Sequence, residues 1–242
     1  MKETFAEKRP YIAVILASLL CTFMTASGMA ATQIMGLKDN SVYGVATIAL
    51  LISVALGILI MKKSKFKLSE YGFRMSEKGS WHKIWWYAPL AAIEVLPIAV
   101  YGFGSGVMPA QYITVGIFAI TVGFNEEIYF RGLALKFLMG KGKKTAIIAS
   151  SVIFGILHLA NALNGKDTLY LVLQMLFAFL VGFVLAEIVS VARSLWPVII
   201  WHAAHDFISI TTGDSINRTA LIILAIQVVV LLIYAVGIWK KS

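Results

Sequence analysis

Long apolar runs alternate with short polar connections along the whole chain, and none of the runs has the two-residue alternation of a half-buried strand. A helix needs about 20 residues to cross the hydrocarbon core of a bilayer, and its backbone must satisfy its own hydrogen bonds there. We therefore expect an all-α, polytopic bundle of about eight transmembrane helices, forming a single transmembrane domain over residues 1–242. The approximate limits of the expected helices are 11–34, 42–61, 84–103, 111–138, 145–162, 169–190, 195–211 and 219–239.

The composition supports a membrane protein. Hydrophobic residues make up 60% of the 242 residues and charged residues 14%, whereas soluble domains have about 25% charged residues. The net charge of +9 does not indicate a nucleic-acid partner, because the basic residues are spread over the short connections. The single cysteine, Cys21, excludes an intramolecular disulfide. The first apolar run exceeds the usual 7–15 residues of a signal-peptide core, so we expect a retained helix.

Lys and Arg residues favour one orientation in the membrane. With the N-terminus in the cytoplasm, 17 of the 21 basic residues lie on cytoplasmic flanks, and only Lys38, Lys166 and Arg218 lie on the opposite side. Cytoplasmic connections are enriched in these residues, so we predict cytoplasmic termini and a multi-pass protein of the cell (cytoplasmic) membrane. Residues 62–83 form a basic, amphipathic cytoplasmic connector, which is suited either to anionic lipid or to a substrate-docking lip.

Three charged residues interrupt the fourth apolar run, in the segment GFNEEIYFRG from Gly123 to Gly132. Glu127 and Arg131 are four residues apart and can pair on one helix face, which leaves the Glu126 carboxylate unpaired. Ionisable residues inside a membrane usually indicate a functional site, and an unpaired carboxylate is suited to general-base catalysis. The alternative is a buried ion network that only fixes helix packing.

The fourth run is also too long for a simple span. From Gln111 to Met139 a helix would measure about 43 Å at 1.5 Å per residue. We expect the helix to tilt, to kink near Gly123, or to continue past the membrane surface. Each of these arrangements would open space around the charged residues.

Two later runs carry polar residues at helical spacing. Phe154 and His158 are four residues apart, and Asn161 follows three residues later, where its amide can fix the imidazole tautomer. His202 and Asp206 are also four residues apart, with His205 between them. Either group alone can be a packing or interhelical hydrogen-bond cluster. Together with Glu126, the histidines are of the types that activate water, directly or through a metal.

The motifs EExxxR (Glu126, Glu127, Arg131), FxxxH (Phe154, His158) and HxxxD (His202, Asp206) occur in this order on successive predicted helices. This set resembles the family of CAAX proteases and bacteriocin-processing enzymes, or Abi family, whose eukaryotic members are type II CAAX prenyl endopeptidases. The resemblance covers roughly residues 70–210, with a catalytic core at about 111–211. It implies an intramembrane endopeptidase that cuts a membrane-presented peptide or protein near the cytoplasmic half of the bilayer.

The resemblance also implies roles for individual residues. Glu126 and His158 would activate the attacking water, while His202 with Asp206 would stabilise the oxyanion or complete the site. The supporting residues would be Glu127, Arg131, Phe154, Asn161 and His205. Many relatives have Asn in place of Asp206, and an ionised Asp cannot donate to an oxyanion. Asp206 is therefore protonated, orients His202 or binds a metal.

Several alternatives remain open at this point. Zinc could bind Glu126, His158 and His202, but the HExxH motif is absent, so we favour a site without cofactor or metal. The substrate could be a CAAX-type protein, or a bacteriocin or other small peptide whose processing matures it or gives immunity. The rival functions are a non-catalytic membrane protein of peptide binding or immunity, and a proton-coupled transporter. The expected partners are the substrate and the lipid bilayer, with no nucleic acid.

Overall fold

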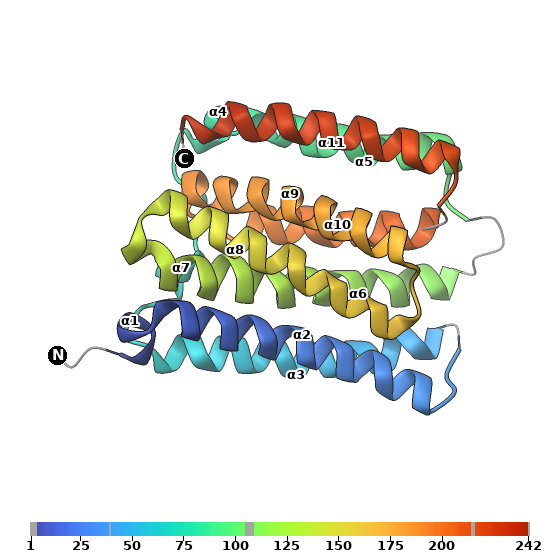
Figure 1. Ribbon diagram of the computed structural model, residues 1–242, viewed down its shortest axis with the longest axis horizontal. Helices are drawn as coiled ribbons and strands as arrows, with labels where there is room; N and C mark the ends of the chain where they lie inside the picture. Colours follow the sequence, from blue (N-terminus) through green and yellow to red (C-terminus); the bar gives the residue numbers. More distant parts are fainter. Residues whose placement is uncertain (1–3, 39, 105–108, 214–215, 242) are drawn as a thin grey trace.

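Eight helices of 14 residues or more run along the long axis of the computed structural model, which describes residues 4–38, 40–104, 109–213 and 216–241 (Figure 1). They are α2 (Pro10–Ile34), α3 (Asn40–Lys63), α5 (Ala88–Tyr101), α6 (Pro109–Glu127), α8 (Lys143–Leu157), α9 (Thr168–Ala192), α10 (Trp196–Thr212) and α11 (Arg218–Trp239). The short elements are α1 (Phe5–Lys8), η1 (Leu68–Tyr71), α4 (Ser80–Lys83), η2 (Trp85–Tyr87), η3 (Ile128–Ala134), α7 (Leu135–Leu138), η4 (Met139–Lys141) and η5 (His158–Asn164). Since these ranges contain no strand, the all-α prediction is confirmed for the described residues.

Six helical stretches of the described chain are long and apolar enough to cross a membrane, against the eight that we expected. They are Pro10–Ile34, Asn40–Lys63, Pro109–Lys141, Lys143–Leu163, Thr168–Ala192 and Arg218–Trp239. The other two expected spans correspond to α5, with 14 residues, and α10, with 17 residues. At 1.5 Å per residue both are shorter than a hydrocarbon core of about 30 Å.

The helix α5 is short because it begins later than the apolar run that contains it. Trp85 and Tyr87 have φ angles of 51° and 56°, which are left-handed and interrupt a regular helix. The helix then starts at Ala88, with a proline in its first turn. The hydrophobic pattern therefore overestimated the length of this element.

The helices pack in layers. Figure 1 shows α5 with α11 along one edge and α2 with α3 along the other, with α6, α8, α9 and α10 between them. The terminal end of the bundle holds α1 and the last turn of α11, so the described chain begins and ends at the same end of the bundle, at opposite edges. The distal end holds the last turns of α2 and α10 (Figure 1). Which side of a membrane the terminal end faces stays a prediction.

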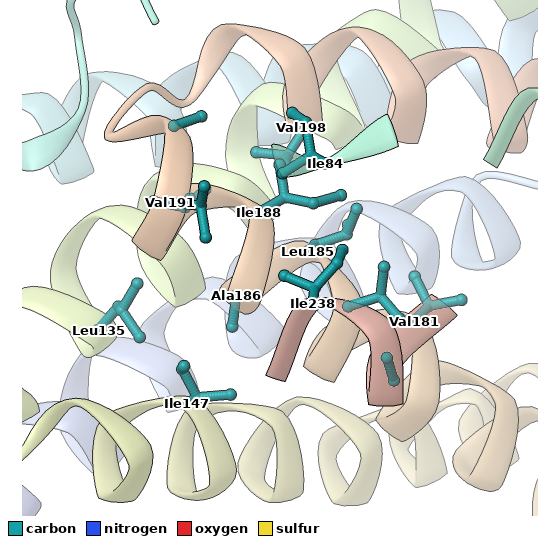
Figure 2. Close-up of a cluster of buried hydrophobic side chains, with 14 of the residues drawn as sticks. Ile84, Leu135, Ile147, Val181, Leu185, Ala186, Ile188, Val191, Val198 and Ile238 are labelled. Carbon is teal, nitrogen blue, oxygen red and sulfur yellow. The ribbon is translucent and has the colours of Figure 1, made fainter. Parts of the chain in front are cut away.

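The core is centred on the second half of α9. Every residue from Val184 to Ala192 is buried, as expected for a helix that is apolar on all sides. Figure 2 shows its side chains, including Leu185 and Ile188, among residues from neighbouring elements such as Ile147 and Ile238. This central helix contacts α8, which ends directly before His158, and α10, which carries His202 and His205.

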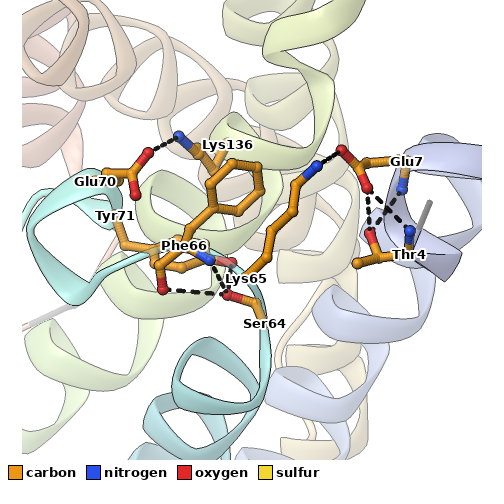
Figure 3. Close-up of polar contacts among 8 residues, drawn as sticks. All are labelled: Thr4, Glu7, Ser64, Lys65, Phe66, Glu70, Tyr71 and Lys136. Carbon is orange, nitrogen blue, oxygen red and sulfur yellow. Dashed lines mark hydrogen bonds and ion pairs between the residues drawn. The ribbon is translucent and has the colours of Figure 1, made fainter. Parts of the chain in front are cut away.

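Charged contacts join the connector to helices on either side at the terminal end (Figure 3). Lys65 pairs with Glu7 of α1, and Lys136 of α7 lies 3.4 Å from Glu70 of η1. The backbone N–H of Lys67 donates to the Glu70 carboxylate and, together with Lys136, lowers the pKa of Glu70. The connector is thus a folded cap with short helices and not an extended loop.

Candidate active site

Glu126 and Glu127 are the last two residues of α6, directly before a π-helical segment. This segment, η3, spans Ile128–Ala134, and all seven of its residues are buried. The irregularity that the length of this helix predicts therefore follows the two glutamates and does not lie at Gly123. Wide π turns occur frequently at functional sites, since they redirect side chains without ending the helix.

Gly123 allows α6 to approach α10 closely. A Cβ atom at this position would lie 3.0 Å from both the Ala203 amide nitrogen and the Ile199 carbonyl oxygen. Both of these atoms belong to the backbone of α10, so they cannot move aside as a flexible side chain does. Small residues commonly allow such close contacts between membrane helices. The close approach brings the glutamates of α6 next to His202 of α10.

Glu127 is fully buried and lies between a histidine and an arginine. Its Oε1 atom accepts a hydrogen bond of 2.7 Å from His202 Nδ1 and lies 3.2 Å from Arg131 Nη1. The guanidinium of Arg131 lies over the Phe154 ring, 4.2 Å from its centroid. Gly182 leaves room for both groups, since a Cβ there would lie 2.9 Å from Phe154 Cδ1 and 3.3 Å from Arg131 Nη2. The pairing of Glu127 with Arg131 is as the helical spacing predicts.

Glu126 and Asp206 face the other nitrogen of His202. His202 Nε2 lies 3.6 Å from Glu126 Oε2 and 3.7 Å from Asp206 Oδ2. Within the described residues, these two buried carboxylate oxygens have no hydrogen-bond partner. Buried polar atoms are nearly always hydrogen-bonded, so unpaired oxygens call for a bound water or substrate as their partner.

His158 has its proton position fixed by the backbone. Its Nδ1 atom lies 2.8 Å from the Phe154 carbonyl oxygen, which can only accept, so Nδ1 carries the proton and Nε2 has a free lone pair. Asn161, which we expected to fix this tautomer, donates instead to Gln174 Oε1 at 2.9 Å. The backbone carbonyl takes the predicted role of the amide, and His158 Nε2 is left as an acceptor.

One cavity of about 370 Å³ brings together the four predicted catalytic residues, Glu126, His158, His202 and Asp206. Asn161 also lines it. Its volume lies in the usual range for ligand sites, about 300–1,000 Å³. A narrower cavity of about 80 Å³ extends from Glu126 and His158 past Phe154 to Cys21.

His205 lies apart from this group. Its Nδ1 atom lies 2.9 Å from Glu94 Oε1, and its ring stacks on Trp201 with centroids 5.1 Å apart. Both His205 and Glu94 line a separate cavity of about 240 Å³. Gln174 and Ser209 line both cavities, although the sequence gave no indication of a role for them at a site. Their positions depend on helix rotation, which has no signal in a nearly uniform apolar pattern.

The described residues contain no group of three or more His, Cys, Asp or Glu side chains arranged to hold a metal ion. The predicted zinc ligands Glu126, His158 and His202 line one cavity without forming such a group. We therefore derive the chemistry of the site from the side chains themselves.

Comparison with known proteins gives a match for the region that forms this site. No curated protein matches the chain. Residues 108–208 match the family model described as "Type II CAAX prenyl endopeptidase Rce1-like". Together with the apolar helices, this match identifies a multi-pass membrane protein. The matched region contains every predicted catalytic residue, and over its length the chain is similar to the Rce1-like type II CAAX prenyl endopeptidases, as the sequence motifs predict.

Proposed function

We propose that the protein is an intramembrane endopeptidase that hydrolyses a peptide bond of a membrane-presented substrate. The observation that carries this proposal is the convergence of Glu126, His158 and His202 on one cavity. The match of residues 108–208 to a family of membrane endopeptidases supports the same reaction class. The proposed substrate is a CAAX-type protein or a small peptide such as a bacteriocin.

Glu126 and His158 activate the attacking water in this proposal. Glu126, with its unpaired Oε2, and His158, with its acceptor Nε2, both line the cavity, so a water bound between these two atoms would have an acceptor for each proton. Glu126 takes one proton as the water oxygen attacks the peptide carbonyl carbon. The same carboxyl group then returns that proton to the leaving amine as the C–N bond breaks.

His202 stabilises the oxyanion of the tetrahedral intermediate. Glu127 holds its Nδ1 atom at 2.7 Å, which fixes the ring so that Nε2 faces the cavity. A protonated His202 donates from Nε2 to the developing negative charge, and preorganised donors of this kind are among the largest contributions to catalysis. Asp206, whose Oδ2 lies 3.7 Å from the same nitrogen, orients the ring and stabilises its protonated form.

The shared cavity weighs against the rival functions. A network that only fixed helix packing has no need to surround a cavity, whereas Glu126, His158 and Asp206 all line one. A peptide-binding protein has no need for a carboxylate and an acceptor imidazole facing one cavity. A proton relay needs groups spaced along a path across the membrane, whereas these groups gather around one cavity.

The test is cleavage by the reconstituted full chain. A farnesylated CAAX-type peptide and a set of unprenylated peptides are offered to the wild type, Glu126→Gln, His158→Gln and a control, Glu187→Gln. Glu187 is buried in α9 and lines neither of the two cavities around His202 and His205. We expect rate losses of about 10²-fold or more for the first two variants, as is typical when general acid–base groups are removed, and little loss for the control. Full cleavage by either of the first two variants would contradict the mechanism.

A further inference from the structure

The cavity with the predicted catalytic residues extends toward the distal end of the bundle. Tyr43 lies in the first turn of α3, Tyr170 lies in the first turn of α9, and Gly213 directly follows α10. All three line the cavity, and all three helix ends lie opposite the terminal end (Figure 1). The described residues of the lining run from the middle of the bundle to its distal end, and none of them belongs to the terminal end.

The path from the terminal end is blocked before it reaches the cavity. A separate cavity of about 390 Å³ enters from that end beside Glu70 and Arg193 and reaches Arg131. Arg131 is paired with Glu127, and these two residues are 2% and 0% exposed. The fully buried π-helical segment Ile128–Ala134 adds to this barrier. Water and peptides at the terminal end are thus separated from Glu126 and His158.

The basic residues assign the two ends of the bundle to opposite sides of the membrane. Of the Lys and Arg residues that the structure describes, 16 belong to the flanks at the terminal end, and three, Lys38, Lys166 and Arg218, lie at the distal end. Short connections rich in Lys and Arg remain in the cytoplasm during insertion. The terminal end therefore faces the cytoplasm, and the distal end faces the other side.

We propose that the cavity receives its substrate from the non-cytoplasmic face of the membrane. Given the endopeptidase activity proposed above, on which this inference rests, the substrates are exported peptides or the external segments of membrane proteins. This differs from cleavage near the cytoplasmic half, which the sequence resemblance led us to expect. The cause is the direction of the cavity, which a sequence does not reveal.

The residues that line the cavity also predict which substrate side chains it accepts. Among the described residues of its lining, none is Lys or Arg, and the two carboxylates of Glu126 and Asp206 outnumber the one cation, the protonated His202 of the proposed mechanism. Much of the remaining wall is aromatic or aliphatic, with Tyr43, Phe118 and Ile210 among its members. Apolar and basic residues near the scissile bond fit this surface, whereas acidic residues would be repelled.

Labelling of single cysteines tests the direction of access. In a Cys21→Ser background, Ser209→Cys places a thiol in the cavity wall. Lys38→Cys and Lys240→Cys, at exposed positions, mark the distal and the terminal ends. Spheroplasts expressing the full chain are treated with a membrane-impermeant maleimide before and after permeabilisation. We expect Lys38→Cys and Ser209→Cys to react in intact spheroplasts, and Lys240→Cys to react at least tenfold less until the membrane is permeabilised.

Three results would overturn the inference. Labelling of Ser209→Cys only after permeabilisation would mean access from the cytoplasm, and no labelling under either condition would mean that water does not enter. External labelling of Lys240→Cys would reverse the topology. Because labelling needs no catalysis, the result is independent of the peptide assay. A Glu126→Gln variant with full activity would therefore contradict the proposed mechanism and leave the direction of access standing.

Discussion

The hydrogen bond of 2.7 Å between Glu127 Oε1 and His202 Nδ1 divides the two adjacent glutamates into different roles. The same Glu127 oxygen also lies 3.2 Å from Arg131 Nη1, so it is shared between the imidazole and the guanidinium. Glu126 faces His202 Nε2 from the other side at 3.6 Å and keeps an unpaired oxygen in the cavity. In the proposed mechanism, Glu127 therefore positions the imidazole and Glu126 acts on the water.

The Glu127–Arg131 pair predicts a specific pattern of stability. Arg131→Met removes the guanidinium from the buried Glu127 carboxylate and leaves it His202 alone, and breaking a buried ion pair costs about 3–5 kcal/mol. The double variant Glu127→Gln/Arg131→Met removes both charges and should recover a large part of this loss. Thermal unfolding of the purified variants in detergent measures both effects. A double variant that is less stable than Arg131→Met would show that the charges do not act as a pair.

Asp206 predicts a difference between two substitutions. Asp206→Asn keeps the size and the oxygen near His202 Nε2, and its amide can also donate to an oxyanion. We expect this variant to retain cleavage within about tenfold of the wild type, whereas Asp206→Leu should lose about 10²-fold. The peptide assay at saturating substrate measures both rates. Equal activity in the two variants would remove Asp206 from the mechanism.

Metal dependence provides a further prediction. Since we derive the reaction from side chains alone, protein purified without chelator should contain far less than one zinc per chain, and treatment with a chelator should leave its cleavage rate unchanged. Elemental analysis and the peptide assay measure the two quantities on one preparation. Stoichiometric zinc whose removal abolishes cleavage, and whose return restores it, would replace this mechanism with a metal-assisted one.

The sequence predicted the parts of this structure that depend on strong local signals. Apolar runs located the long helices, and the spacing of Glu127 and Arg131 predicted their contact. The sequence did not predict features that depend on backbone conformation. Trp85 and Tyr87, for example, have left-handed conformations that delay the start of α5. Nothing in the pattern of IYFRGLA distinguishes a π-helical segment from a regular helix.

The contacts of the site residues likewise divide into those that the sequence predicted and those that it did not. Residues within one motif could be grouped from their spacing, but contacts between distant helices could not. His205 forms a hydrogen bond with Glu94, 111 residues earlier in the chain, and Gln174 accepts a hydrogen bond from the side-chain amide of Asn161. The tautomer of His158 depends on the carbonyl of Phe154, a backbone group that side-chain reasoning overlooked. These relationships follow from helix rotation and packing, which a nearly uniform apolar sequence does not encode.

Gly123 and Gly116 provide a matched pair of substitutions on α6. A Cβ at Gly123 would lie 3.0 Å from two backbone atoms of α10, whereas a Cβ at Gly116 would lie 3.9 Å from the Phe207 ring, an ordinary contact. Gly123→Ala should therefore push α6 away from α10 and separate Glu126 from His202. A displacement of about 1 Å at a catalytic site can lower the rate by about 10²-fold, so we expect a loss of that order.

Gly116→Ala is the control, because it makes the same chemical change in the same helix. Replacing glycine by alanine in a helix interior favours the helix by about 1 kcal/mol, so this variant should be as stable as the wild type or more stable. Its cleavage rate should be close to that of the wild type. Cleavage rates and unfolding temperatures of the two variants are compared in one detergent. If both variants cleave at the wild-type rate, the close approach at Gly123 does not position the site.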